Sequence, residues 1–240
     1  GQDGDIQAGA AWPSPRFTDN SNGTVTDNLT GLVWLQDANC VNATRDWATA
    51  LSDVIQLNQT GAMNGNNCGD VSNGGSHQTD WRLPNVNELE SLIHAEQADT
   101  AIWLNTQGFS NVRSSWYWSS TTDAYGTDDA WGVGMGVGLV LSGNKGNNYY
   151  VWPVRGPLYN LAISRAGTGT GTVTSNPAGI DCGVTCAADF SENTVVTLTA
   201  TSDIGSTFTG WSGDADCSDG SVTMSAAINC TATFTLKTTQ

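Results

Sequence analysis

Charge is scarce in this sequence of 240 residues: Asp, Glu, Lys and Arg make up 13% of it, about half of the roughly 25% that is usual in soluble domains. Basic residues are the scarcest, with 8 Lys and Arg against 23 Asp and Glu, and the formal net charge is −15. A nucleic-acid partner requires clustered Lys and Arg to meet its phosphates, and here these residues are scattered. We therefore expect no nucleic-acid partner.

Histidine is also rare, which limits the chemistry that the chain can perform. His77 falls in a Gly/Ser-rich loop and His94 on the polar side of an expected helix, and neither belongs to an HExxH motif. Both are interpreted as solvated surface groups, so catalysis by a metal or an activated nucleophile is disfavoured. Glu88 and Glu90 stand two positions apart on that helix, hence on different sides, and do not form a general acid–base pair. We expect no enzymatic activity.

Long apolar runs are absent. No stretch approaches the roughly 18 residues of a membrane-spanning helix, so we expect no membrane span. The first residues, Gly-Gln-Asp-Gly-Asp, do not form a signal peptide. The chain is interpreted as a mature secreted protein whose export signal has been removed.

Cysteine is present in an even number, six, and the cysteines separate by region. This favours disulfides and an oxidising compartment outside the cell. No spacing matches a zinc site. A bridge between Cys40 and Cys68 would join the ends of an expected helix and stabilise the fold by about 3 to 4 kcal/mol through loop-closure entropy. The candidate pairs farther along are Cys182–Cys186 and Cys217–Cys230.

Composition divides the chain into three parts. Residues 1–15 form a polar N-terminal segment that would become ordered only by docking on its own domain or on a neighbouring molecule. Residues 16–157 mix helical and strand patterns, beginning with three short strands between Arg16 and Trp34. Residues 158–240 show short Thr- and Val-rich runs with period-two alternation, which is typical of an all-β module. Its inward positions would be Leu161, Ile163, Val196, Leu198, Ala200, Ala232, Phe234 and Leu236.

The stretch Asp80–Ile93 predicts a capped helix. Pro84 favours extended geometry at the residue before it, Asn85 is a good N-cap, and Glu88 stands where the carboxylate of a capping box reaches back to the N–H of the cap. Apolar residues follow at helical spacing and predict a buried face. The stretch is therefore interpreted as scaffold, with Arg82 as a buried pairing group. Its structural residues are Trp81, Arg82, Pro84, Asn85 and Glu88.

A first helix is expected before this one, over Thr44–Leu57, with Thr44 as its N-cap. The glycine- and asparagine-rich run Gly61–Gly75 that follows it predicts a surface loop. The apolar face of this first helix would consist of Trp47, Leu51, Val54 and Ile55.

The candidate binding site follows the scaffold. Residues 114–122 alternate aromatic and hydroxyl side chains like a strand, and in residues 130–140 glycine takes every second position, which leaves one face of an expected strand bare for the close approach of rings. Aromatic rings stack on sugar or peptide faces while hydroxyls fix the orientation. The predicted ligand-binding residues are Trp116, Trp118, Ser119, Ser120, Asp123, Tyr125, Asp128, Asp129 and Trp131.

Alternatives stay open for parts of this site. Asp123, Asp128 and Asp129 offer the clustered oxygens that calcium prefers, but a solvated acidic loop also explains them. The hydroxyls of Ser119 and Ser120 are common at strand edges without any ligand. Calcium is the one cofactor that the sequence leaves open.

Five motifs, in order along the chain, resemble those of a known family. They are Arg16–Trp34, Trp81–Leu89, Tyr117–Thr122, Ala130-Trp131 and Tyr150–Arg155. Together they resemble the bacterial Lcl C-terminal domain family. The resemblance implies an α+β protein with a C-type-lectin-like domain, in which two helices flank twisted antiparallel sheets. It also implies that the protein resembles adhesins, which bind glycosaminoglycans or host surfaces.

Residues 158–240 are similar to bacterial surface modules of the internalin B-repeat kind, which implies a stalk or spacer. The motifs that carry this likeness are residues 166–174, Asp181–Cys186 and Phe208–Gly213. The calcium motifs of sugar-chelating lectins are absent from the chain. The formylglycine-generating enzymes share the fold class, but they work with a redox cysteine pair, whereas Cys40 and Cys68 bracket a helix.

The leading hypothesis is a non-enzymatic protein, secreted or at the bacterial cell surface, that serves adhesion or extracellular assembly and binds carbohydrate or a surface protein. The second is a homo-oligomer, the subunit of an extracellular fibre or surface layer, because two different domains offer two surfaces for a head-to-tail contact that does not close. The third is an enzyme of the formylglycine-generating kind.

Overall fold

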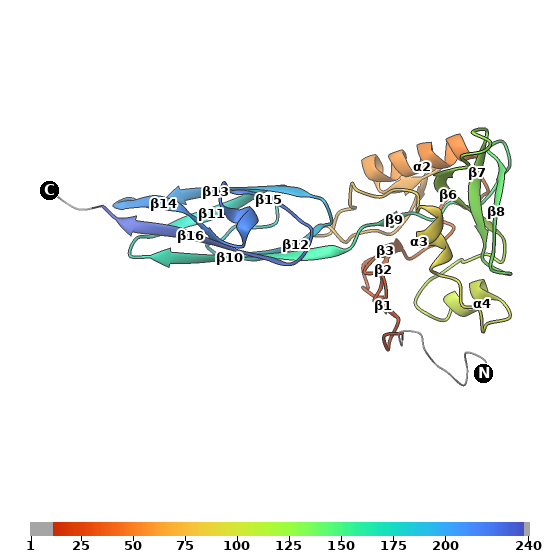
Figure 1. Ribbon diagram of the computed structural model, residues 1–240, viewed down its shortest axis with the longest axis horizontal. Coiled ribbons are helices and arrows are strands. Elements are labelled where there is room, and N and C mark those ends of the chain that lie inside the picture. Colours follow the sequence, from red (N-terminus) through yellow and green to blue (C-terminus); the bar gives the residue numbers. More distant parts are fainter. Residues whose placement is uncertain (1–11, 238–240) are drawn as a thin grey trace. The chain divides into compact units, whose positions relative to one another are not determined.

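The computed structural model describes residues 12–237, which form two compact units that divide between Arg155 and Gly156 (Figure 1). This division lies two residues before the expected boundary at residue 157. Among the described residues there are three α-helices, all in the first unit, and most of the remaining ordered backbone is strand. The fold is therefore mixed α+β and largely β. Residues 1–11 lie outside the described part, so their docking stays a prediction, whereas Trp12 of the polar segment 1–15 packs on its own unit, beside His94.

The N-cap of helix α2 (Trp47–Thr60) is Asp46 and not Thr44, so the helix begins two residues later than expected. Hydrogen bonds from the backbone N–H and the hydroxyl of Thr49 favour the Asp46 carboxylate and lower the pKa of Asp46 below its ordinary value. The prediction for Ile55 was also wrong, since its side chain is 58% exposed. The helix instead buries Ala50, Asp53, Val54 and Leu57.

Helix α3 (Val86–Glu90) confirms the predicted capping box between Asn85 and Glu88. Arg82 pairs with Glu88 at 2.6 Å as expected, but its side chain is 45% exposed, so its predicted burial was wrong. A third helix, α4 (Thr100–Leu104), was not predicted; Asp99 caps it.

The first unit contains two main sheets. In order, the first is β1-β2-β3-β9 and the second is β6-β7-β8, and all their strand pairs are antiparallel. The expected single strand over residues 130–140 is instead a hairpin, whose turn at residues 135–138 ends on Gly138 with a φ of 69°. The strands are β1 (Phe17–Asp19), β2 (Thr24–Asp27), β3 (Val33–Leu35), β4 (Ala62–Met63), β5 (Asn66–Asn67), β6 (Trp116–Thr122), β7 (Asp129–Gly134), β8 (Leu139–Asn144) and β9 (Val154–Arg155).

The core of the first unit is aromatic. Trp34, Tyr117, Trp118 and Trp152 are fully buried, and the ring centroids of Trp34 and Trp152 lie 5.3 Å apart. His94 belongs to the margin of this core, because its ring packs edge-on at 4.7 Å against the rings of both Trp12 and Trp103. The interpretation of His94 as a solvated surface group was therefore wrong.

The run Gly61–Gly75 is more ordered than a surface loop. It contains β4 and β5, and it holds Asp70, which is 5% exposed. The Asp70 carboxylate accepts hydrogen bonds from the backbone of Ser72 and Gln78, the hydroxyl of Ser72, and the indole N–H of Trp81 at 2.8 Å. This carboxylate therefore joins the run to the start of the predicted scaffold stretch.

The second unit consists of two sheets with the orders β12-β10-β16-β14 and β11-β13-β15. Strands β10 and β16 pair in parallel, and the predicted inward residues are buried or half-buried except Leu236, which is 62% exposed. All three predicted disulfides are confirmed, here and in the first unit. The strands are β10 (Leu158–Gly167), β11 (Gly171–Asn176), β12 (Ala187–Ser191), β13 (Val195–Ser202), β14 (Ser206–Gly213), β15 (Ser221–Thr223) and β16 (Ile228–Leu236).

Candidate functional site

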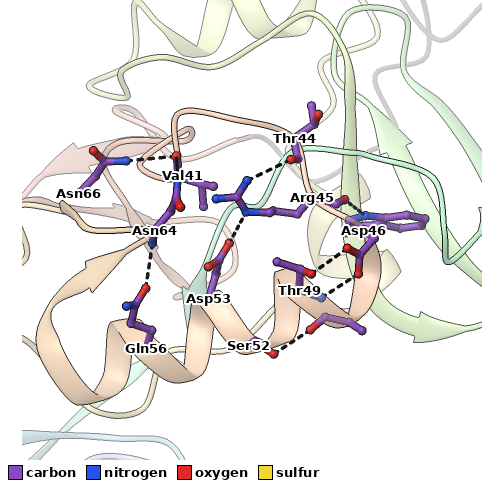
Figure 2. Close-up of polar contacts among 12 residues, drawn as sticks. Val41, Thr44, Arg45, Asp46, Thr49, Ser52, Asp53, Gln56, Asn64 and Asn66 are labelled. Carbon is purple, nitrogen blue, oxygen red and sulfur yellow. Dashed lines mark hydrogen bonds and ion pairs between the residues drawn. The ribbon is translucent and has the colours of Figure 1, made fainter.

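Arg45 fixes the framework beneath the β6-β7-β8 sheet. Its guanidinium donates to Asp53 on α2 at 2.7 Å (Figure 2). Its carbonyl accepts from the indole N–H of Trp118 on β6 at 2.7 Å. Its backbone exchanges two hydrogen bonds with the backbone of Tyr149, at 2.8 and 2.9 Å. One residue thus ties the helix to the sheet and to the segment that carries Tyr149.

The ring of Tyr149 lies against bare backbone. Its centroid is 4.1 Å from that of Trp118, and a Cβ on Gly132 would come within 3.3 Å of its ring. A Cβ on Gly143 would meet its hydroxyl at 2.5 Å. The prediction that alternate glycines admit aromatic rings is confirmed at Gly132, and the structure adds Gly143 on the neighbouring strand.

The predicted binding residues do not form one surface. Trp118 and Ser119 have no exposed surface, and the Ser119 hydroxyl donates to the carbonyl of Trp131 at 2.6 Å. Their assignment to a surface site is corrected, because both belong to the core. Trp116 and Trp131 are both partly exposed, but they occupy opposite faces of the sheet: Trp116 is paired with Gly134, three positions from Trp131.

Trp116 is also remote from the aspartate loop along β6. It begins the strand whereas the loop follows the end of the strand at Thr122, a separation of about 20 Å at the usual rise per residue. Alternation of residue types indicated which side chains share a face, but it did not show which face is buried. The predicted residues that remain near the loop are Ser120, Asp123, Tyr125, Asp128, Asp129 and Trp131.

The loop between β6 and β7 has a defined backbone. The N–H of Asp123 donates to the carbonyl of Asp129 at 3.0 Å, and the N–H of Asp129 donates to the carbonyl of Gly126 at 2.8 Å. The N–H of Tyr125 donates to the Asp123 carboxylate at 3.0 Å. The Tyr125 side chain is nevertheless fully exposed, at 103%. The hydrogen-bonded loop between β6 and β7 thus exposes the aromatic ring of Tyr125 to solvent.

Lys145, which the sequence analysis missed, supports this loop from the end of β8. Its ammonium donates to the carbonyl of Thr127 at 2.7 Å and to the hydroxyl of Thr122 at 3.0 Å. It also lies 4.4 Å from the centroid of the Trp47 ring. No short-range signal predicts these contacts, because the partners lie far from Lys145 in the sequence.

Two of the three acidic side chains of the loop already have protein donors. Asp123 accepts from Tyr125, and the Asp129 carboxylate accepts from the Asn144 amide at 3.3 Å. Within residues 12–237, no group of three or more His, Cys, Asp or Glu side chains is arranged to hold a metal ion. Calcium at Asp123, Asp128 and Asp129 therefore stays a prediction.

Comparison with protein families matches residues 23–155, more than half of the chain, to the Lcl C-terminal domain. The chain belongs to the Lcl C-terminal domain family. Residues 159–238 match the divergent InlB B-repeat domain, so the order of the two expected modules is confirmed. A search of curated proteins finds no match to this Lcl family member.

The two domain families, together with three disulfides, indicate a bacterial surface protein. In the described range, 12–237, no helix is long and apolar enough to cross a membrane.

Proposed function

We propose that this Lcl family protein is a non-enzymatic, extracellular protein of the bacterial surface that binds a carbohydrate through the loop Asp123–Asp129. The observation that carries the proposal is the fully exposed ring of Tyr125 on a hydrogen-bonded loop. An aromatic face stacks on the apolar face of a sugar. Because the loop is already ordered, little conformational entropy is lost when a ligand binds.

The charge of this loop narrows the class of ligand. The loop that carries Tyr125 contains three aspartates, and the whole chain carries a net charge of −15. Like charges repel and raise the energy of approach for a polyanion. We therefore assign a neutral or amino-bearing glycan as the ligand, in preference to the sulfated glycosaminoglycans that the family resemblance implies.

The architecture assigned to this function is a C-type-lectin-like first unit that carries the binding loop and a second unit that acts as a spacer. The absence of enzymatic activity is part of the proposal. Its support is that Cys40 and Cys68, the candidate redox pair, are bonded to each other and each only 4% exposed. Such a bridge is suited to a structural role.

The test is a glycan array probed with the full chain and with Tyr125→Ala. We expect the substitution to weaken binding about fivefold or more, since stacking on one ring contributes on the order of 1 kcal/mol or more. Ile204→Ala in the second unit, also fully exposed at 106%, is the matched control and should bind normally. Absence of binding to every glycan, or equal binding by both variants, would reject the proposal.

A chelator arm decides the role of calcium. Binding by aromatic stacking and hydroxyls persists in EDTA, whereas a calcium-dependent site at Asp123, Asp128 and Asp129 loses its ligand. Recovery of binding on adding calcium back would assign the metal to the site.

A second candidate function is a subunit of an extracellular fibre or surface layer. It is favoured by exposed apolar side chains in both units, with Leu141 at 52% and Ile204 at 106% exposure. Two such surfaces on one chain are what a head-to-tail contact requires. Negative-stain microscopy tests it, and isolated particles at every concentration would reject it.

A further inference from the structure

Strand β8 is the outer strand of the β6-β7-β8 sheet. The N–H of Lys145, just beyond its end, donates to the carbonyl of Asp128 at 2.9 Å, which sets the hydrogen-bonding phase of the ladder between β7 and β8. In an antiparallel ladder the bonded pairs alternate, so Leu139, Leu141 and Gly143 bond to β7. The N–H and C=O groups of Val140 and Ser142 therefore point away from the sheet.

This edge lacks the usual protection against pairing with another strand. Residues 130–144 contain no charged side chain, and no bulge interrupts the register between β7 and β8. Natural edge strands are normally blocked by charge, proline, a bulge or a covering segment.

Other edges that the structure describes carry such devices. Strand β14 has a register shift between Phe208 and Gly210, β12 contains Asp189, and the outer side of β6 is bridged at Tyr117 by Tyr150. Within residues 12–237, β8 differs from these edges, because it is six residues long and regular and no neighbouring strand bonds to its outer side.

The side chains along this edge are apolar and exposed. Leu139 and Leu141 lie on the same face of the sheet and are each 52% exposed, and Val137 in the adjoining turn is 72% exposed. Trp116 continues this face two strands away, because it pairs with Gly134, which in turn pairs with Leu139. An exposed apolar patch beside an open edge marks an interaction surface.

We propose that β8 pairs antiparallel with β8 of a second copy of this chain, which joins two three-stranded sheets into one continuous sheet across a two-fold axis. The two-fold axis passes between Val140 and the second copy's Val140. Leu139 then lies opposite the second copy's Leu141, and Leu141 lies opposite the second copy's Leu139. The four leucines then cover one another on a single face. Such a surface is self-complementary, as a two-fold interface requires.

Self-complementarity favours a second copy as the occupant, because pairing two β8 strands brings the exposed Leu139 and Leu141 of one copy against the same leucines of the other. Each chain carries −15, so two copies repel wherever their carboxylates would meet. The uncharged run 130–144 is the surface on which two acidic molecules can approach without burying or opposing carboxylates. A basic partner would instead be attracted to the acidic surface outside this run.

This pairing is independent of the proposed ligand, because it uses the edge of β8 and not the ring of Tyr125. It also differs from a fibre contact, since a two-fold interface closes on itself. A fibre would need a further surface.

The first test is sedimentation equilibrium of the full chain over a concentration series. A single pair of strands makes a small interface, so we expect a reversible dimer with a dissociation constant on the order of 1 to 100 μM. Leu141→Lys should weaken the dimer at least tenfold, because it places a charge on the paired edge. Ile55→Lys, a similarly exposed apolar position on α2 at 58%, is the control and should leave the constant unchanged.

The second test locates the two-fold axis. All six cysteines are in disulfides, so one introduced cysteine is a clean probe. Val140→Cys faces its own counterpart at a Cα separation near 5.5 Å, within disulfide range, and should form a covalent dimer on oxidation. Ser142→Cys faces the second copy's Gly138 and should not.

Three outcomes would overturn the proposal. The first is a wild-type chain that stays monomeric up to about 1 mM, far above the dissociation constant expected for such an interface. The second is a dimer that Leu141→Lys leaves intact. The third is cross-linking through Ser142→Cys in preference to Val140→Cys. A monomeric chain in which Leu141→Lys abolishes capture of an extended peptide would assign the edge to a strand from another protein.

Discussion

The ammonium of Lys145 lies 4.4 Å from the centroid of the Trp47 ring while it donates a hydrogen bond of 2.7 Å to the carbonyl of Thr127. The contact connects the first turn of α2 with the loop that carries Tyr125. The ring and the two oxygen acceptors replace the water around the ammonium, so the free-energy cost of its desolvation is small. The order of the loop therefore depends on a residue outside it.

Lys145→Met should loosen the aspartate loop without unfolding the first unit. The substitution keeps the length of the side chain but removes the donors to Thr122 and Thr127, at a local cost of about 1 to 2 kcal/mol. Amide hydrogen exchange at Asp123, Tyr125 and Asp129 should become about tenfold faster. Lys237→Met, which changes the only other lysine, is the control; equal exchange in both variants would show that Lys145 does not hold the loop.

Asp70→Ala should destabilise the first unit by about 2 to 4 kcal/mol, measured by urea unfolding. The carboxylate is buried and accepts four hydrogen bonds, so its removal leaves buried donors without a partner, among them the indole N–H of Trp81. Glu90→Ala on the exposed side of α3 should change stability by less than about 0.5 kcal/mol. A similar loss in both variants would contradict the assigned network.

The disulfides should contribute unequally to stability. Cys40 and Cys68 are 28 positions apart, whereas Cys182 and Cys186 are 4 apart. Loop-closure entropy then predicts a loss of about 3.5 kcal/mol for Cys40→Ser with Cys68→Ser, and about 2 kcal/mol for the corresponding double variant of the shorter loop. Urea unfolding of each variant, read from the unit that carries the bridge, checks the order, and a larger loss from the shorter loop would refute it.

Alkaline pH should destabilise the first unit through Tyr117. Burial raises the pKa of its phenol well above the ordinary value near 10. As the pH rises, the unfolded chain therefore releases this proton at a lower pH than the folded chain does. The contribution of Tyr117 to the free energy of unfolding is fully present below about pH 10, and above that pH it falls by up to about 1.4 kcal/mol for each pH unit. Tyr117→Phe should flatten this decline, at a cost of about 1 kcal/mol at neutral pH because Tyr117 accepts the N–H of Arg113 at 2.8 Å. Tyr125→Phe, at a fully exposed position, should keep the decline; an identical pH profile for all three chains would count against Tyr117.

Local chemistry explains which features the sequence predicted. The capping box of Asn85 and Glu88 spans four residues, and its partners are dictated by backbone geometry alone. The pairing of Cys40 with Cys68 followed from parity and from the separation between regions, whereas these two arguments left three pairings open for the four cysteines of residues 158–240. The helix start was misplaced because Thr44 and Asp46 are both good caps, and the choice depends on Arg45 pairing with Tyr149, far along the chain.

Features that depend on distant partners escaped prediction. Nothing near Asp70 in the sequence shows that Trp81 will donate to it, and nothing near Lys145 shows that Trp47 will lie beneath it. The hairpin of β7 and β8 was read as one strand because its turn, Met135–Gly138, contains no Asn, Asp or Pro. The same misreading concealed β8, and with it the open edge.

The parallel pairing of β10 with β16 has a mechanical consequence. The chain enters the second unit at the start of β10 and leaves it at the end of β16, and these points lie at opposite ends of the paired strands. Tension on the chain therefore pulls the two strands past each other along their length. All seven residue pairs, from Leu161 with Ile228 to Gly167 with Phe234, then bear the force at the same time, so their hydrogen bonds do not break one after another. A force applied between the two ends of the second unit would therefore load β10 and β16 in shear.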